Sequence, residues 1–221
     1  MPRGSIQGGY AWQTAFRYYH DFYPGRCRSR GPLQRDLVFG FDFRRTNTNL
    51  FFGQHVVFDS LADIAHIVLG YESTRETSWG TQRLGATTYV SPGGFSPFNS
   101  DFYFNQLQPG ATAEYIYARA FLEESIGLRR EWQLYGKLTG QVSDSVLLSS
   151  EQLGFGGYNS IRGYDMRLVN GDEGWILNLE LRTRPLRFKP GRRHHALQGI
   201  VFYDCGDSSR RNELAGLPSD V

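Results

Sequence analysis

Arg162 lies in the stretch GFGGYNSIRGYD, residues 154–165, which contains four glycines and no obvious catalytic side chain. An arginine stays charged at physiological pH and presents a planar set of N–H donors that fits a carboxylate. Downstream, the alternation of apolar and polar residues places Glu180 and Asp204 on the polar faces of two predicted strands. The chemistry that this stretch can supply is therefore the binding of a carboxylate.

Other polar clusters do not match a catalytic or metal-binding pattern. The serines at 145, 149 and 150 lack the G-x-S-x-G context of an activated nucleophile. The histidine pair at 194–195 follows a KPGRR turn, and no further metal ligands can be assigned to it. The sequence therefore predicts no catalytic residue, no cofactor and no metal site.

The elements that must position Arg162 are predicted to be strands. Apolar and polar residues alternate with period two through much of the chain, as in RDLVFGFDFRR and WILNLELRT. Many of the segments have about the 9–11 residues that a bilayer-spanning strand needs. The pattern predicts one all-β domain with about nine strands, at 10–19, 35–45, 49–58, 63–73, 81–90, 113–123, 131–142, 175–183 and 197–205.

Two architectures fit strands that have one apolar and one polar face. In a soluble β-sandwich the apolar face packs inward, whereas in an outer-membrane barrel it meets lipid and the polar face lines a lumen. Trp12, Tyr71, Trp132 and Trp175 lie near strand ends, as the aromatic girdles of a membrane barrel require. Charged residues in mid-strand also suit a wet interior. These features favour the barrel, and a soluble sandwich is the alternative.

Composition excludes some classes of protein and leaves the barrel open. The chain has 24 basic and 22 acidic residues and a net charge of +2, which gives no basis for nucleic-acid binding. Its mean hydropathy is −0.44, and no run approaches the apolar length of a transmembrane helix. Cys27 and Cys205 lie far apart without zinc-type spacing and are expected to be free thiols.

Three segments in succession carry a family resemblance. They are LGFGGYNSIRGYD (153–165), NGDEGWILNLELRTRP (170–185) and GIVFYDCGD (199–207). Together they resemble three signatures of the BamA/TpsB outer-membrane protein superfamily. The matching residues are the tetrad Ile161, Arg162, Gly163 and Tyr164 after the pair Gly156 and Gly157, the strand element around Glu180, and Phe202, Asp204 and Gly206 of an F-x-D-x-G motif.

The resemblance implies a sixteen-stranded antiparallel transmembrane β-barrel in the bacterial outer membrane. Within the superfamily, the GDEGWILNLELR strand is most similar to two-partner secretion transporters of the ShlB/FhaC/HecB type, which export a large haemolysin or adhesin. The implied partners are a secreted polypeptide and outer-membrane lipid, and no covalent chemistry is implied. The closest alternative is a factor of BamA or TamA type, which inserts other barrels into the membrane.

Within that family the arginine tetrad belongs to an extracellular loop that folds back into the lumen, here residues 153–170. We expect Arg162 to pair with Asp204 as a latch, with Glu180 nearby. Gly156, Gly157 and Gly163 are expected to adopt positive φ and to approach the barrel wall closely. Tyr164 and Phe202 are expected to pack beside the ion pair.

The chain departs from the family pattern in its extent. It carries about nine of sixteen strands, and neither POTRA domains nor a signal peptide precede them in the sequence. Residues 1–221 are therefore interpreted as a partial barrel domain from a longer protein, which is expected to form a monomeric barrel. An alternative of another class is a soluble β-sandwich binding module or glycoside-active domain that uses Glu180 and Asp204 as acid and base.

Overall fold

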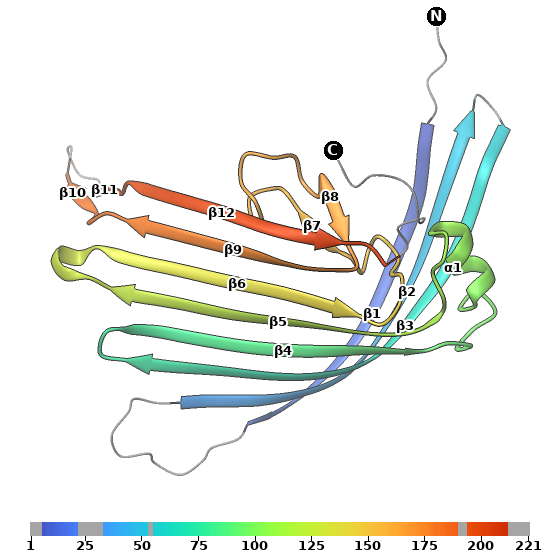
Figure 1. Cartoon of the computed structure of the whole chain (residues 1–221), viewed down its shortest axis with the longest axis horizontal. Coiled ribbons are helices and arrows are strands. Elements are labelled where there is room, and N and C mark those ends of the chain that lie inside the picture. The colour runs from blue at the N-terminus through green and yellow to red at the C-terminus, as the bar shows by residue number, and fades with distance from the viewer. Residues whose placement is uncertain (1–5, 22–32, 53–54, 190–193, 212–221) are drawn as a thin grey trace, which may run out of the picture.

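The computed structural model describes residues 6–21, 33–52, 55–189 and 194–211 (Figure 1). Eight strands form one antiparallel sheet, in the order β1-β2-β3-β4-β5-β6-β9-β12. These strands are β1 (Ile6–Asp21), β2 (Leu33–Phe52), β3 (His55–Thr77), β4 (Gly80–Pro92), β5 (Glu114–Gly127), β6 (Gln133–Ser143), β9 (Glu173–Arg182) and β12 (Ile200–Ser209). The prediction of an all-β antiparallel fold is confirmed.

Small elements decorate the connections between these strands. A short helix α1 (Asp101–Leu107) follows β4, and a 3-10 turn (Arg129–Glu131) joins β5 to β6. Two short hairpins are formed by β7 (Leu153–Phe155) with β8 (Val169–Gly171), and by β10 (Leu186–Phe188) with β11 (His195–Leu197). Within the described ranges, no helix has the length and apolar character needed to cross a membrane.

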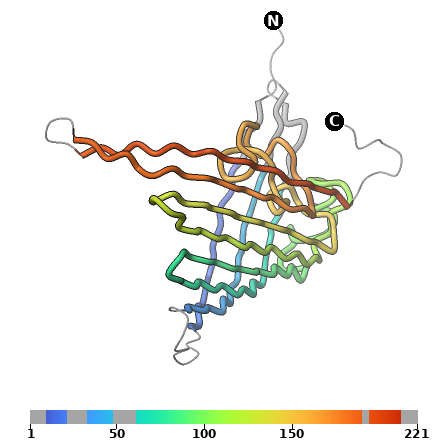
Figure 2. The backbone as a smooth tube through the Cα atoms, turned by 60° about the vertical axis from the view of Figure 1, so that its left-hand side comes forward, coloured from blue at the N-terminus to red at the C-terminus, as the bar shows by residue number. Residues whose placement is uncertain are grey.

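The sheet is strongly twisted and uneven in height. In both views β1–β3 run steeply across the direction of β9 and β12 (Figures 1 and 2). Strand β4 pairs with β3 only from Ile67 to Thr77 and ends at Pro92, so residues 55–64 of β3 extend beyond it. The connections after β4 and β6 are long, whereas β3 to β4 and β5 to β6 turn tightly at the other end. Unequal loops of this kind are typical of outer-membrane barrels.

One face of the sheet is apolar and exposed. Directly paired residues share a face, and pairs such as Phe41 with Ile67 and Leu138 with Leu177 lie on this one. Its exposed large side chains come from all eight strands and include Trp12, Phe16, Phe39, Phe41, Ile67, Leu69, Leu84, Ile116, Leu122, Leu134, Leu138, Val142, Trp175, Leu179, Leu181, Val201 and Tyr203. So wide an apolar surface suits hydrocarbon and does not suit water.

The opposite face is polar, and two connections fold onto it. Paired residues on this face include Asp42 with His66 and Arg119 with Gln141. The buried hydrophobic cluster is small and joins this face to the two long connections. It comprises Ala62, Ile64, Phe104, Ala111, Ala113, Tyr115, Tyr117, Val146, Leu147 and Leu148. Most of the buried side chains therefore lie on the polar side of the sheet, as in a barrel with a filled interior, while Phe95 and Ser96 pack on the other face against Phe41, Phe43 and Asp63.

The predicted strand at 49–58 is wrong as a separate element. Its first residues complete β2, and its last residues begin β3, while residues 53–54 lie outside the described ranges. The turn-forming composition of 45–47 is overridden because Arg45 continues in β2 and its Nε donates to Asp63 Oδ1 of β3 at 2.6 Å. The main sheet consequently has eight strands where nine were expected.

The orientation of the two faces predicts that a lysine substitution destabilises the protein at one residue of β6 and has little effect at the next. We expect Leu138→Lys, on the apolar face, to lower the free energy of unfolding in phospholipid vesicles by about 2–4 kcal/mol, because it places a charge in hydrocarbon. Thr139→Lys, on the polar face at the same depth, is the matched control and should change it by less than about 1 kcal/mol. Denaturant titration followed by heat-modifiable migration measures both, and equal losses would contradict the assignment.

Candidate functional site

The connection between β6 and β9, residues 144–172, folds over the polar face of the sheet (Figure 1). Its two arms are joined by the β7–β8 pairing, in which Leu153 pairs with Gly171 and Phe155 with Val169. Beyond this hairpin, the chain reverses and carries Arg162 back to the wall formed by β9 and β12. A loop that reverses twice within about thirty residues needs the glycines that the sequence supplies here.

Arg162 is bound by two carboxylates from adjacent strands. Its Nε lies 2.7 Å from Asp204 Oδ2, its Nη2 2.6 Å from Asp204 Oδ1, and its Nη1 2.5 Å from Glu180 Oε1. The backbone N–H of Arg162 also donates to Asp204 Oδ2 at 3.0 Å. The side chains of Arg162, Glu180 and Asp204 are 15%, 12% and 1% exposed, so the group is largely withdrawn from water.

The register of β9 with β12 explains why these carboxylates meet. Asp204 pairs with Asn178, and Phe202 pairs with Glu180, so all four side chains project from the polar face. Asn178 Nδ2 donates to Asp204 Oδ1 at 2.9 Å and to the main-chain oxygen of Ser160 at 2.6 Å. The amide therefore fixes the orientation of the aspartate and holds the loop at a second point.

A second arginine and an aromatic ring complete the ion-pair site. Arg182 Nη2 lies 2.6 Å from Glu180 Oε2, so two guanidinium groups face two carboxylates and the site is neutral overall. The Arg162 Cζ lies 3.9 Å from the centroid of the Phe202 ring, within cation–π range. Hydrogen bonding to Asp204 raises the pKa of Arg162 further above its ordinary value, which keeps the guanidinium charged.

The structure therefore brings Arg162, Asp204, Glu180 and Phe202 together, as the residue types suggested. Ile161 packs beside them against the small cluster of Leu153, Phe155 and Ile176. Tyr164 does not pack beside the ion pair as expected, since it is 62% exposed. The reason is that the chain turns away from the wall directly after the arginine.

The glycines adopt the expected backbone conformation but not the expected contacts. Gly156, Gly157 and Gly163 have φ values of 101°, 95° and 92°. A Cβ on Gly156 would lie 2.1 Å from the oxygen of Asp165, which belongs to the returning arm of the loop, and one on Gly163 would meet nothing within 4 Å. The expected close approach of these glycines to the wall is wrong, because the loop there packs on itself.

Phe155 is an important residue that the sequence pattern did not indicate. Its side chain is buried and lies over two glycines of the wall. A Cβ on Gly174 would lie 2.9 Å from Phe155 Cζ, and one on Gly206 would lie 3.0 Å from Phe155 Cε1. Gly206 of the F-x-D-x-G motif thus makes room for a ring from the loop, and the available signal was the presence of a glycine on each of two neighbouring strands, Gly174 and Gly206.

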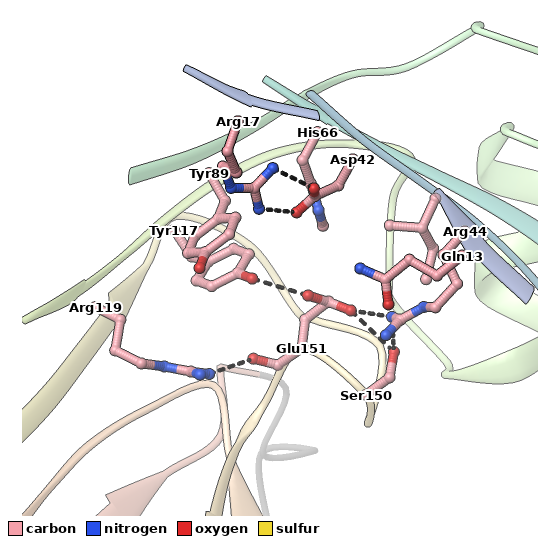
Figure 3. Close-up of a pocket in the computed structure, with 11 residues that line it drawn as sticks. Gln13, Arg17, Asp42, Arg44, His66, Tyr89, Tyr117, Arg119, Ser150 and Glu151 are labelled. Atoms are coloured by element: carbon pink, nitrogen blue, oxygen red, sulfur yellow. Dashed lines mark hydrogen bonds and ion pairs between the residues drawn. The ribbon is translucent and has the colours of Figure 1, made fainter. Parts of the chain in front are cut away.

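A cavity of about 260 Å³ lies beside the first arm of the loop (Figure 3). Glu151 forms an ion pair with Arg44 of β2 and accepts a hydrogen bond from Tyr117 Oη at 2.8 Å. On the far wall, Arg17 forms an ion pair with Asp42. The residues that surround the cavity are Gln13, Arg17, Asp42, Arg44, Ile64, His66, Tyr89, Tyr117, Arg119, Ser150 and Glu151.

The charge of Glu151 is stabilised by its neighbours. Burial alone would raise the pKa of Glu151, but the Arg44 charge and the hydrogen bond from Tyr117 outweigh it, so the pKa lies below its ordinary value. A carboxylate with a depressed pKa stabilises the folded state above its ordinary pKa, and this stabilisation is lost as the pH falls through the lower, folded-state value. The contact between the loop and β2 is therefore present at neutral pH.

The geometry does not favour acid–base catalysis at Glu180 and Asp204. Both carboxylates are already bound by Arg162, and Asp204 is 1% exposed, so neither faces a space that a sugar could occupy. Across the described ranges, no cluster of three or more His, Cys, Asp and Glu side chains could hold a metal ion. His195, half of the histidine pair, stacks on Phe188 with centroids 5.5 Å apart.

An antiparallel sheet with a lipid-type outer face, a polar inner face and an inward loop held by an arginine defines a bacterial outer-membrane β-barrel protein. The sequence model of one family, described as "Haemolysin secretion/activation protein ShlB/FhaC/HecB", matches residues 69–217, about two thirds of the chain. The chain belongs to this family of outer-membrane secretion proteins, whose transporters act with a secreted partner polypeptide.

The fold resembles that of a solved structure. CdiB from Escherichia coli superposes with a TM-score of 0.69 at 15% sequence identity, over 92% of this chain and 40% of the CdiB chain. At this identity the similarity establishes the fold, and the chain spans about 40% of the length of CdiB. A comparison with curated protein sequences found no match.

Proposed function

We propose that this chain forms part of the barrel of a two-partner secretion transporter, which exports a large polypeptide across the outer membrane without covalent chemistry. The observation that carries the proposal is the loop 144–172, which lies on the polar face and binds both Asp204 of β12 and Arg44 of β2. These strands stand at distant positions in the sheet order, so the loop lies across the interior that an exported chain must pass.

The ion-pair site gives this loop the character of a latch. Arg162, Glu180 and Asp204 are largely buried, and separating them without new partners would strand charges in a medium of low dielectric constant. Water or polar groups of an entering polypeptide can solvate all three charges once the loop moves. Displacement of the loop is therefore coupled to wetting of the interior, and both happen when the exported chain arrives.

The same proposal includes the contact of the barrel with lipid and its closure. The apolar face contacts outer-membrane lipid, and the eight strands contribute half of a sixteen-stranded barrel that closes as a monomer. Residues 153–170 are the part of the inward loop that carries the transport motif. Closure of the barrel leaves the lumen as the single polar route across the bilayer.

Export is tested in a cell that makes the full-length protein and a large secreted polypeptide of the kind with which transporters of this family act. Deleting the transporter should leave that partner in the periplasm, and reintroducing the wild-type gene should return it to the medium. The abundance of unrelated outer-membrane barrels, measured in the same cells, should stay unchanged. Normal export of the partner together with a loss of those barrels would overturn the proposal and indicate an assembly factor.

A further inference from the structure

The inward loop has two parts that are attached to the wall in different ways. We call residues 144–152 the base and residues 156–166 the tip. The base lies among buried side chains, and Val146, Leu147 and Leu148 are 9%, 0% and 4% exposed. In the tip, by contrast, Tyr158 and Met166 are 85% and 82% exposed.

The base is joined to the end of the same loop by Asp172, which is fully buried. Asp172 Oδ1 accepts hydrogen bonds from the backbone N–H of Leu147 and from Gln152 Nε2, both at 2.9 Å. Its Oδ2 accepts from the backbone N–H of Arg211 at 3.0 Å. These bonds close the base into a compact unit with the start of β9 and the residues after β12.

Glu151 ties this unit to strands on the other side of the interior. Its carboxylate binds Arg44 of β2 and Tyr117 of β5 (Figure 3). Its main-chain oxygen accepts hydrogen bonds from Arg119 Nη2 at 3.3 Å and Gln141 Nε2 at 3.2 Å. One residue thus links the base to β2, β5 and β6, and β2 is separated from β6 by three strands in the sheet.

The tip is attached through fewer groups. Arg162 binds Asp204 and Glu180, the oxygen of Ser160 accepts from Asn178, and Ile161 packs against the wall. Directly after β7, where the tip begins, two successive glycines at 156–157 have positive φ. Successive glycines let the backbone change direction at low steric cost.

We propose that Glu151 is a positioning residue that keeps the base fixed to β2 while the tip leaves Asp204 and Glu180 during export. The loop then opens about residues 156–157 and does not move as a whole. The route for the exported chain opens along β9 and β12, and the base continues to cover β2 and β3. This inference rests on the proposed export function.

Two reversible cross-links in the full-length protein separate the base from the tip, with Cys27 and Cys205 replaced by serine. Ala111 and Val146 face each other in an isolated parallel bridge, so A111C with V146C can form a disulfide that locks the base. S160C with N178C, joined by a bis-methanethiosulfonate reagent, locks the tip to β9. We expect the base lock to leave export at the level of its reduced form, and the tip lock to stop export until reductant is added.

The cross-linking results distinguish a failure of this inference from a failure of the proposed function. Loss of export in the base-locked protein, restored by reductant, would show that the base must move and would overturn the inference. Normal export in the tip-locked protein would overturn it as well, because the tip would then have no need to leave the wall. If the reduced proteins and the wild type all fail to export a partner, the proposed function itself is wrong, and the position of the base is still tested by the labelling below.

Thiol labelling tests the role of Glu151 without any export assay. In the same background, L148C reports on the base, since Leu148 is buried. We expect E151Q to raise its labelling rate about 100-fold, as loss of one partner of a buried ion pair shifts an opening equilibrium. E151D and the double reversal R44E with E151R should return the rate toward wild type.

The matched control is R162A, which releases the tip and should leave labelling of L148C unchanged. A rise at L148C in R162A as large as that in E151Q would show that the loop moves as one body. An unchanged rate in E151Q would show that Glu151 does not hold the base. Either result overturns the inference.

Discussion

R162D should impair export, and D204R alone should do the same, because the loop then loses the closed position from which an exported chain displaces it. Each change leaves a buried charge without its partner, which costs about 3–5 kcal/mol in the closed state of the loop. The double variant R162D with D204R should regain export, because the ion pair is restored and Glu180 faces an arginine again. Partner protein in the medium and heat-modifiable migration of the barrel, read from the same cells, measure function and folding separately.

The matched control is a second ion pair on the polar face, Arg83 with Glu123. Its closest N–O distance is 3.6 Å and the side chains are 47% and 23% exposed, so R83D should cost less than about 1 kcal/mol. Arg162→Lys separates the effect of the charge from that of the hydrogen bonds, because lysine keeps the charge but cannot bind Asp204 with two parallel hydrogen bonds. Normal export in R162D and in D204R would show that the pair does not act as a latch.

Gly156→Ala should displace the tip of the loop and reduce export. Both Gly156 and Gly163 have positive φ, so alanine at either position is strained by about 1–3 kcal/mol. At Gly156 the new Cβ would also lie 2.1 Å from the backbone oxygen of Asp165. Because that oxygen belongs to the backbone, no side-chain rotation relieves the clash and the backbone must move. Limited proteolysis of the loop in vesicles, together with the export assay, measures the displacement.

Gly163→Ala isolates the effect of backbone conformation, since its Cβ would meet no atom within 4 Å. We expect it to keep most of the export and to leave the loop protected from protease. Equal cleavage in the two variants would mean that positive φ, and not the contact with Asp165, determines the path of the loop.

The wall of the barrel could be predicted from the sequence because a strand has a strict period of two. That period placed Glu180 on the polar side of β9 and Asp204 on the polar side of β12, and the register of the two strands bears this out. The motif around Arg162 then supplied the partner. The failure at 49–58 has the opposite cause, since pairing with β3 kept β2 in strand conformation through a segment whose composition is typical of a turn.

The second attachment of the loop could not be predicted in this way. Glu151 meets Arg44 because the sheet curves and the loop crosses its interior, and no local pattern in either segment encodes that approach. Asp172 lies in the recognised stretch NGDEGW, but its function depends on donors from Leu147 and Arg211, which are distant in sequence. Helix α1 is too short for a helical period to be detected.

The unequal heights of the strands give the rim of the wall a step. Residues 55–64 of β3 extend past the end of β4 by roughly 33 Å of strand, and β2 extends beside them. The connection that contains α1 packs into the corner of this step, where Ile64 and Phe104 share one buried cluster. We expect a polypeptide that emerges from such a barrel to meet the extended ends of β2 and β3 on one side. It should bend toward the side where the strands are shorter, and so leave the barrel in a defined direction.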